Sequence, residues 1–389
     1  MDVPLSRAAT LRRLALPLVV CCVLLGVAYA RTSEGTKHAS PWGYRNWSFS
    51  TLTYSDILAL HEDRGGGAHP LPYLRDKIEY PVLLGLSMWW PSAVQPNRAG
   101  YFALTFLMLA ICGVLSLYFI GTFPGAKPWF FAASPALLVY SALNWDLLGI
   151  LPLVLGIWLW ARGRERQATF ALSIAVWTKF FPILVLGVLL VVATRRSWKY
   201  ASQLVAIFAG VTLVLNLPFA LAAYDNWRWF FEYNRIREIE PSLYLLFGQV
   251  NTKAFAPTAN LISAAVTLTA AAAISLYELR TRRLLALPAA CALVCVFFTV
   301  NKVYSPQYWL WVVALTALVG LPEWLLSVVG CTALCDFIVS FMLLHFQVTR
   351  DSQAAWFYRS LFWPMVAVRY SVLAACAASA FSRSRRVAI

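Results

Sequence analysis

The sequence predicts an all-α protein whose helices cross a membrane many times, within a single transmembrane domain that covers residues 1–389. Composition indicates this first, because 60% of the residues are hydrophobic and only 13% are charged. A soluble globular protein is about half apolar, with about a quarter of its residues charged. The second indication is that arginines and lysines occur in short clusters between long apolar runs.

The basic clusters assign a side of the membrane to each predicted loop. Short loops rich in Lys and Arg stay in the cytoplasm, so the clusters mark the inner face of a plasma membrane and place both termini there. The net charge of +15 is then explained by topology and anionic lipid head groups, and no nucleic-acid partner is predicted. The clusters are Arg7 with Arg12 and Arg13; Arg162, Arg164 and Arg166; Arg195, Arg196 and Lys199; Arg280, Arg282 and Arg283; and Arg383, Arg385 and Arg386.

The first predicted span runs from Leu14 to Ala30. Its basic start and small-residue end also resemble a cleavable signal peptide, but we favour a retained span because many others follow. Residues 31–80 are too acidic and too interrupted, notably by the glycines at 65–67, to cross, so they form a long first outer loop. The run Pro81–Pro91 is too short to cross about 30 Å of hydrocarbon and is predicted to be an interfacial or re-entrant helix.

Residues 167–194 form an apolar run with basic clusters at both ends and with Lys179 and Pro182 at its centre. A single crossing would put one basic cluster outside. Two half-length helices of about 14 residues, each rising about 21 Å, keep both clusters inside and place Lys179 at the tip of a broken hairpin. Because a charge at that depth is tolerated only where it lines a cavity, the hairpin predicts a buried polar site.

The other predicted spans follow from apolar length and from alternation between the two sides, and they bring the total to about ten full spans plus the re-entrant hairpin. Before the hairpin they are Tyr101–Gly121, Trp129–Leu143 and Leu147–Ala161. After it they are Tyr200–Ala222, Ala259–Tyr277, Leu284–Val300, Tyr308–Leu321, Trp324–Leu344 and Tyr358–Phe381. Residues 223–258 form a second outer loop, in which Arg235 and Arg237 near acidic residues are interpreted as a solvated charged stretch.

Three polar elements face the same outer side in this topology. They are the acidic first outer loop, the hairpin tip at Lys179 and the turn around Lys302. A carboxylate can accept a hydroxyl proton, and a lysine can hold a phosphate as a point charge. The pattern therefore suits an enzyme that joins a lipid-borne phosphate compound to an outer acceptor.

Several short motifs in order carry a family resemblance over residues 50–320. The motifs are Tyr54-Ser55-Asp56-Ile57, Arg64-Gly65, Pro72-Tyr73, Glu79-Tyr80-Pro81-Val82-Leu83, Asn144-Trp145-Asp146-Leu147-Leu148, Lys179-Phe180-Phe181-Pro182 and Asn301-Lys302-Val303-Tyr304-Ser305-Pro306-Gln307-Tyr308. This set resembles the actinobacterial integral membrane proteins related to glycosyltransferase family 87, the polyprenyl-phosphate-mannose-dependent mannosyltransferases of the GT-C fold.

The resemblance implies a GT-C-like fold and an inverting transfer of a sugar, mannose favoured, from a polyprenyl-phosphate donor to an extracytoplasmic lipid or glycan acceptor. It implies that Asp56 is the general base. The residues assigned to the donor phosphate are Lys179, Lys302, Tyr304 and Gln307, and those assigned supporting roles are Glu79, Tyr80, Asn144 and Asp146. No cofactor is expected, no metal site is indicated, and the expected partners are membrane lipids, the donor and the acceptor.

Each candidate also has a structural interpretation. Asp56 and Ser55 can satisfy free amides at a helix start, Asp146 and Glu79 can cap a helix or pair with a lysine, and Lys302 can snorkel to the interface. The whole chain could instead be a lipid or glycan transporter, with gates at both ends of its substrate path. A non-catalytic assembly protein is favoured if Asp56, Lys179 and Lys302 lie far apart.

Overall fold

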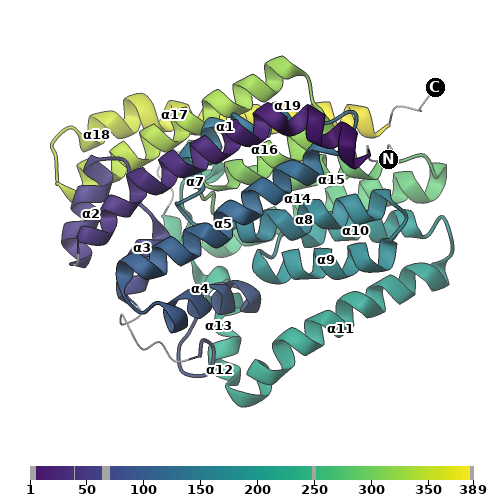
Figure 1. Cartoon of the computed structure of the whole chain (residues 1–389), viewed down its shortest axis with the longest axis horizontal. Helices are drawn as coiled ribbons and strands as arrows, with labels where there is room; N and C mark the ends of the chain where they lie inside the picture. Colours follow the sequence, from purple (N-terminus) through teal and green to yellow (C-terminus); the bar gives the residue numbers. More distant parts are fainter. Residues whose placement is uncertain (1–5, 39, 64–70, 248–250, 386–389) are drawn as a thin grey trace.

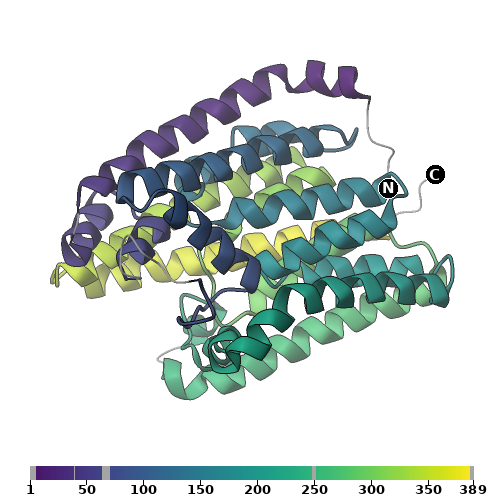
Figure 2. The ribbon, with the colours of Figure 1, turned by 60° about the horizontal axis from the view of Figure 1, so that its bottom comes forward.

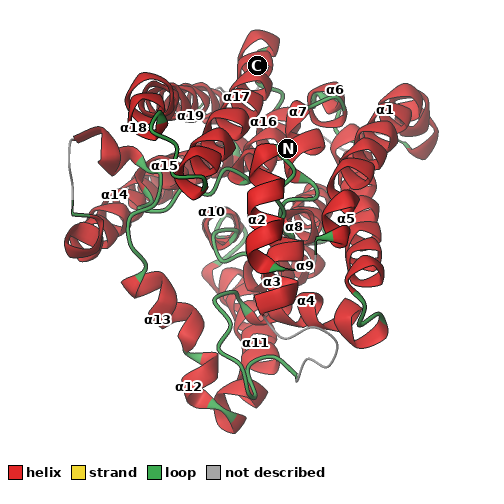
Figure 3. Cartoon of the chain, turned by 90° about the vertical axis from the view of Figure 1, so that its left-hand side faces the viewer, coloured by secondary structure: helices red, strands yellow, loops and turns green. Residues whose placement is uncertain are grey.

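The computed structural model describes residues 6–38, 40–63, 71–247 and 251–385. Within these ranges every regular element is a helix (Figures 1 and 3), which confirms the all-α class. The Arg64-Gly65 motif, the glycines at 65–67 and Arg386 lie outside the described residues.

Six helical segments of the described chain are long and apolar enough to cross a membrane, as a multi-pass membrane protein requires. They include α1 (Arg7–Ser33), α5 (Arg98–Gly121), α11 (Trp198–Ala222), α14 (Thr252–Thr281), α17 (Glu323–Val348) and the continuous segment formed by α18 (Ala354–Phe357), η3 (Tyr358–Phe362) and α19 (Trp363–Ser384). Figure 2 shows α1 along one edge of the bundle, with α11 and α14 along the opposite edge.

Shorter apolar helices fill the spaces between the long ones. They are α4 (Val82–Val94), α6 (Pro128–Ala132), α7 (Pro135–Tyr140), α8 (Asp146–Ala161), α9 (Glu165–Thr178), α10 (Ile183–Ala193), α15 (Ala286–Val300) and α16 (Tyr308–Val319). The predicted span Trp129–Leu143 consists of α6 and α7, which are separated at Ala133 and Ser134, directly before Pro135. Proline disfavours a helical conformation in the residue before it and lacks the N–H that would continue the helix.

The start of α1, the end of α19 and the turns α8–α9, α10–α11 and α14–α15, which carry the described basic clusters, lie at one end of the bundle, which we call the basic end (Figure 1). Hydrogen bonds across this end join Arg13 to the Phe123 carbonyl at 2.6 Å and Arg195 to Glu278 at 2.6 Å. A third joins the Leu285 amide to the Ser384 carbonyl at 2.9 Å. We call the opposite end, where α3, α4, α12 and α13 lie, the cavity end. The clusters that predict topology from sequence are therefore neighbours in the folded chain.

Helices α9 and α10 form a hairpin whose tip is the break Lys179–Pro182. The far ends of the two helices meet at the basic end, where Arg196 Nη1 lies 3.3 Å from Glu165 Oε2. The break follows from Pro182, which disfavours a helical conformation in the residue that precedes it. Lys179 closes α9 and is carried to the cavity end.

The two long loops contain short helices that sequence patterns do not predict. The first loop holds η1 (Glu34–Lys37), α2 (Pro41–Ser50) and α3 (Asp56–Asp63), and the second holds α12 (Tyr224–Trp227), α13 (Trp229–Ile236) and η2 (Leu243–Phe247). Helix α14 begins at Thr252, within the predicted second loop 223–258. Asn251 caps this start by accepting a hydrogen bond from the Ala254 amide at 3.0 Å.

Candidate functional site

A cavity of about 690 Å³ lies at the cavity end of the bundle. Its walls come from the first loop, the hairpin tip, α13, α14 and the turn that follows α15. Six of the residues singled out from sequence line it: Asp56, Glu79, Tyr80, Lys179, Lys302 and Gln307. Segments that are up to 250 positions apart in the chain thus meet around one space.

Asp56 stands at the start of α3, and the backbone around it is fastened to the turn before α8. Its amide donates to the Leu143 carbonyl at 2.7 Å, and the Ser55 hydroxyl donates to the Ala142 carbonyl at 2.5 Å. The Ser55 amide in turn donates to the Tyr44 hydroxyl at 2.8 Å. The Ser55 side chain therefore does not cap α3, and Asp56 is held at the cavity wall.

Asn144 connects the acid to the lysine. Its amide nitrogen donates to Asp56 Oδ2 at 2.8 Å, and its amide oxygen accepts from Lys179 Nζ at 3.3 Å. The oxygen also accepts from the Trp145 backbone amide at 2.7 Å, which fixes the orientation of the side-chain amide. The nitrogen lies 3.4 Å from the Tyr80 hydroxyl. The Asn144 side-chain amide thus bonds to the Asp56 carboxylate through its nitrogen and to the Lys179 ammonium group through its oxygen.

Asp146 lies behind the cavity wall and supplies the counter-charge to Lys179, with Oδ1 3.5 Å from Nζ. Asp146 is fully buried, and its Oδ1 also accepts from Trp311 Nε1 at 2.7 Å. A Cβ atom at Gly149 would lie 2.6 Å from the Trp311 ring, so only glycine allows that ring to reach Asp146. The expectation that Asp146 pairs with a lysine is met by Lys179, which also lies 5.3 Å from the centre of the Tyr80 ring.

Burial raises the pKa of Asp56 above its usual range, and nearby Asp146 acts in the same direction. Hydrogen bonds from Asn144 and Tyr54, followed by the charge of Lys179, oppose this shift. Burial also raises the pKa of Tyr80, so its hydroxyl stays protonated, and the hydroxyl oxygen accepts from Asn144. The cavity wall thus places the Asp56 carboxylate, whose pKa is raised, near the neutral phenol of Tyr80.

Lys302 fastens the second loop to the turn after α15. Its ammonium group donates to the carbonyls of Arg235 at 3.0 Å and Arg237 at 2.6 Å, and its own carbonyl accepts from the Glu240 amide at 3.2 Å. Because Lys302 is buried, the snorkelling interpretation is wrong. Burial lowers its pKa, and the charge of Arg237 lowers it further.

Arg237 is the cavity residue that sequence reasoning misjudged. The solvated-loop interpretation fits Arg235, whose side chain is 71% exposed and pairs with Glu232, but it is wrong for Arg237. Arg237 lines the cavity and forms two hydrogen bonds of 2.5 Å to Glu240. The cavity is also lined by Phe230, Phe231, Tyr233 and Asn234 of α13, and Arg237 directly follows this helix.

Tyr304 is a correction to the expected phosphate site, since it does not line the cavity. Its ring is buried, and the Arg369 guanidinium lies 4.4 Å from the ring centre. Residues Val303 and Ser305 on either side of it do line the cavity. Successive side chains of an extended segment point to opposite sides, so Tyr304 faces the core where its neighbours face the cavity.

Asp336 and Arg369 form a fully buried ion pair that the sequence analysis did not identify. The Arg369 Nε lies 2.9 Å from Asp336 Oδ2, and a second, shorter hydrogen bond joins Nη2 to Oδ1. Trp309 Nε1 donates to Asp336 at 2.8 Å, and Arg369 Nη1 donates to the Pro241 carbonyl at 2.8 Å. The sequence does carry a signal for this pair. The acidic residue Asp336 lies inside the apolar run of α17, and the basic residue Arg369 lies inside that of α19.

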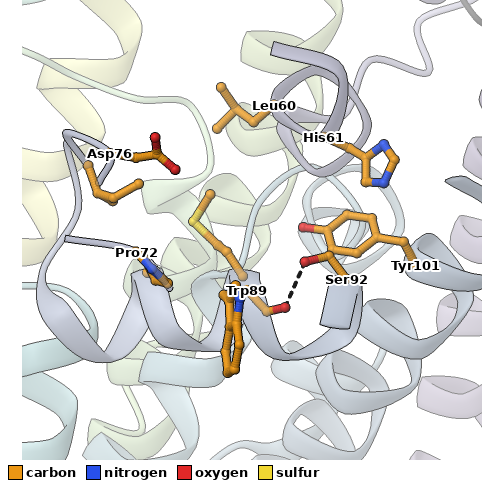
Figure 4. A pocket seen from close by; sticks show the side chains of 10 residues that line it. Leu60, His61, Pro72, Asp76, Trp89, Ser92 and Tyr101 are labelled. Atoms are coloured by element: carbon orange, nitrogen blue, oxygen red, sulfur yellow. Dashed lines mark hydrogen bonds between the residues drawn. The ribbon is translucent and has the colours of Figure 1, made fainter. Parts of the chain in front are cut away.

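A second pocket of about 40 Å³ lies beside the large cavity and shares Leu60 with it. Figure 4 shows His61 and Tyr101 on one side of this pocket and Asp76 across from them. Ser92 donates to the Trp89 carbonyl at 2.7 Å along its α4 wall. A water molecule occupies about 30 Å³ in the liquid, so the pocket is too small for a sugar.

No protein-family model matches this chain, and no curated protein sequence matches it significantly. In the described part of the chain, no three His, Cys, Asp or Glu side chains come together as a metal site. Any assignment of function therefore depends on the cavity and on the motifs that line it.

Proposed function

We propose that this chain is a membrane glycosyltransferase that moves a sugar, mannose favoured, from a polyprenyl-phosphate donor to a lipid or glycan acceptor. The observation that carries the proposal is that Asp56 shares one cavity with Lys179, Arg237 and Lys302. Sugar transfer from a lipid phosphate needs a base beside the acceptor hydroxyl and positive charge beside the departing phosphate. The resemblance to the family 87 transferases points to the same chemistry.

The reaction is a single displacement. The Asp56 carboxylate takes the proton of the acceptor hydroxyl while that oxygen forms a bond to the anomeric carbon of the sugar. The bond from the anomeric carbon to the phosphate oxygen breaks, and its electron pair leaves with the polyprenyl phosphate. Lys179, the cation joined to Asp56 through Asn144, stabilises the charge of the leaving phosphate. Attack from the face opposite the phosphate inverts the anomeric configuration.

The apolar side of the cavity suits a ligand that carries a long hydrocarbon chain. Three large apolar side chains that line the cavity are also exposed on the protein surface: Phe180, Phe231 and Leu268, the last to 67%. Exposed apolar patches mark lipid or ligand contacts. A chain entering beside these residues would leave its phosphate among the cations and its tail in the bilayer.

We place the basic end in the cytoplasm and the cavity end outside the plasma membrane, following the positive-inside rule. No residue that lines the cavity comes from the basic end of the described chain, which favours an enzyme pocket open to one side over a transporter path. The meeting of Asp56, Lys179 and Lys302 at one cavity counts against a non-catalytic assembly protein.

The direct test is to reconstitute the purified protein in vesicles with radiolabelled polyprenyl-phosphate mannose and, separately, polyprenyl-phosphate arabinose. Label is expected to move from the mannose donor into an acceptor extracted from the same membranes. Transfer of arabinose alone would make arabinose the donor sugar. Transfer of neither label would contradict the proposed activity.

Lys179→Gln is expected to lower kcat/KM for the donor by roughly 10- to 100-fold, since a hydrogen bond to a charged group contributes about 1.5 to 3 kcal/mol. Initial rates of label transfer measure this loss. Lys127→Gln at the basic end, where Lys127 pairs with Glu323, is the matched control and should keep the parental rate. Arg237→Gln supplies a second cavity variant if Lys179→Gln folds poorly, and parental kinetics in both would contradict the phosphate assignment.

Asn144→Leu is expected to move the acid limb of the kcat/KM profile to higher pH. The hydrogen bond from Asn144 lowers the pKa of Asp56, so its removal lets burial raise that pKa further. A base works only when it is deprotonated, so activity is lost at a higher pH as the solution is acidified. Rates across a pH series measure the limb, and an unchanged limb, or one displaced to lower pH, would show that Asp56 is not the titrating base.

A further inference from the structure

Helix α14 presents a polar stripe to the cavity within an otherwise apolar stretch. Asn260, Ser263 and Thr267 all line the cavity, at spacings of three and four positions that place them on one helix face. Ala264 and Leu268, which also line the cavity, flank the stripe. Neither the proposed mechanism nor the sequence motifs use this stripe.

The hydroxyls of this stripe are left without partners in the described chain. Thr267 is only 7% exposed, yet its Oγ1 makes no hydrogen bond. Hydroxyls in apolar helices usually donate to the carbonyl four residues earlier, as Ser275 of the same helix does to Ala271 at 2.8 Å. No hydrogen bond joins the Ser263 hydroxyl to another described residue. Because an unmet buried polar group costs about 1 to 3 kcal/mol, a ligand that accepts from these hydroxyls gains binding energy.

Asn260, the first residue of the stripe, lies close to the cation Lys302. Asn260 Nδ2 and Lys302 Nζ both donate to the Arg235 carbonyl, each at 3.0 Å. From Asn260, the helix rise places Ser263 about 4.5 Å and Thr267 about 10 Å farther toward the basic end. A ligand that reaches both hydroxyls therefore extends from a positively charged region into a deeper, less polar one.

The residues that line the cavity distinguish three possible ligands of the stripe: a sugar, a polyprenyl chain and a glycerophospholipid. Side chains of Ile183, Leu184 and Phe297 also line the cavity, so a sugar among them would leave most of its hydroxyls unpaired. A polyprenyl chain carries no oxygen below its phosphate. A glycerophospholipid carries a phosphate, then two ester carbonyls that only accept hydrogen bonds, then acyl chains. The hydroxyl donors of Ser263 and Thr267 therefore match the two ester carbonyls of a glycerophospholipid.

We propose that the α14 wall of the cavity is a binding site for a glycerophospholipid. The phosphate lies beside Arg237 and Lys302, and the hydroxyls of Ser263 and Thr267 donate to the two ester carbonyls. The acyl chains leave past Leu268, which lines the cavity and is 67% exposed. This site shares Arg237, Lys302 and Leu268 with the proposed donor site, but the contacts of Ser263 and Thr267 with ester carbonyls do not depend on sugar transfer.

The test compares dioctanoyl phosphatidylglycerol with its dioctyl ether analogue, which has the same head group and chain length but no carbonyls. Binding of each to the purified full-length protein in detergent is measured by titration. The ester is expected to bind roughly 10- to 30-fold more tightly, since each hydrogen bond contributes about 1 kcal/mol. The Ser263→Ala, Thr267→Val double variant is expected to lose this preference and to bind the ether like the parent.

Three further measurements make the result decisive. Ser275→Ala, whose hydroxyl is already satisfied within α14, should keep the ester preference. Thr267→Val alone should not lower the thermal midpoint, because it removes an unpaired buried hydroxyl. Farnesyl phosphate should bind the parent and the double variant equally, which separates this site from a polyprenyl-phosphate site. Equal binding of ester and ether to the parent, or equal loss of both in the double variant, would overturn the proposal.

Discussion

The Asp56→Asn variant is expected to lose sugar transfer by roughly 10²- to 10⁴-fold, the range contributed by a positioned general base. The substitution keeps the shape of the side chain and an oxygen that can accept from Asn144, which donates to Asp56 Oδ2 at 2.8 Å. Backbone ties to Leu143 and from Ser55 to Ala142 are untouched. Initial rates of label transfer, normalised to protein in the vesicles, measure the loss.

Asp76→Asn is the matched control for this experiment. Asp76 belongs to the same loop but lines the small pocket and not the large cavity (Figure 4). Its variant should transfer sugar at the parental rate, and both variants should keep the parental thermal midpoint. Full activity of Asp56→Asn would remove the assigned base while leaving the cavity open to another function.

The second large effect concerns stability. Arg369→Met is expected to lower the free energy of unfolding by about 3 to 5 kcal/mol, because it leaves the Asp336 carboxylate buried without its counter-charge. Both side chains are fully buried, so solvent does not compensate. The variant also loses the hydrogen bond to Pro241 and the contact with the Tyr304 ring, which support the second loop and the turn after α15. Thermal unfolding in detergent, with the yield of folded protein, measures the change.

The double variant Asp336→Leu, Arg369→Met tests whether charge is the cause. Removing both partners of a buried pair is far less costly than removing one, so the double variant should regain much of the lost stability. A double variant that is less stable than Arg369→Met would show that shape and hydrogen bonds to Trp309 and Pro241, and not the unpaired charge, dominate at this position.

Sequence reasoning was most informative where a polar residue interrupts an apolar run. Lys179 stands out because a charge at that depth is costly, and the structure brings it together with Asn144 and Asp146. The same reasoning located the helix break at Pro182, since proline acts on its immediate neighbours. The membrane-facing helices follow for the same reason, because apolar length is a local property of the chain.

Features that depend on distant neighbours were not predictable from the sequence. Arg235 and Arg237 differ by two positions, and only the packing of α13 against the cavity separates an exposed side chain from a lining one. Tyr304 shares a motif with Lys302 but turns toward Arg369, which lies 65 positions away in the last helix. Local patterns place a residue on an element, while the partner across the bundle decides what that residue contacts.

The order in which the chain is synthesised suits the hairpin formed by α9 and α10. With 14 and 11 residues, these helices rise about 21 and 17 Å, so neither reaches across about 30 Å of hydrocarbon alone. We expect them to enter a bilayer as one unit, with the ammonium group of Lys179 at its leading point. Asn144 and Asp146 precede Lys179 in the chain, so the residues that pair with its ammonium group are synthesised before it.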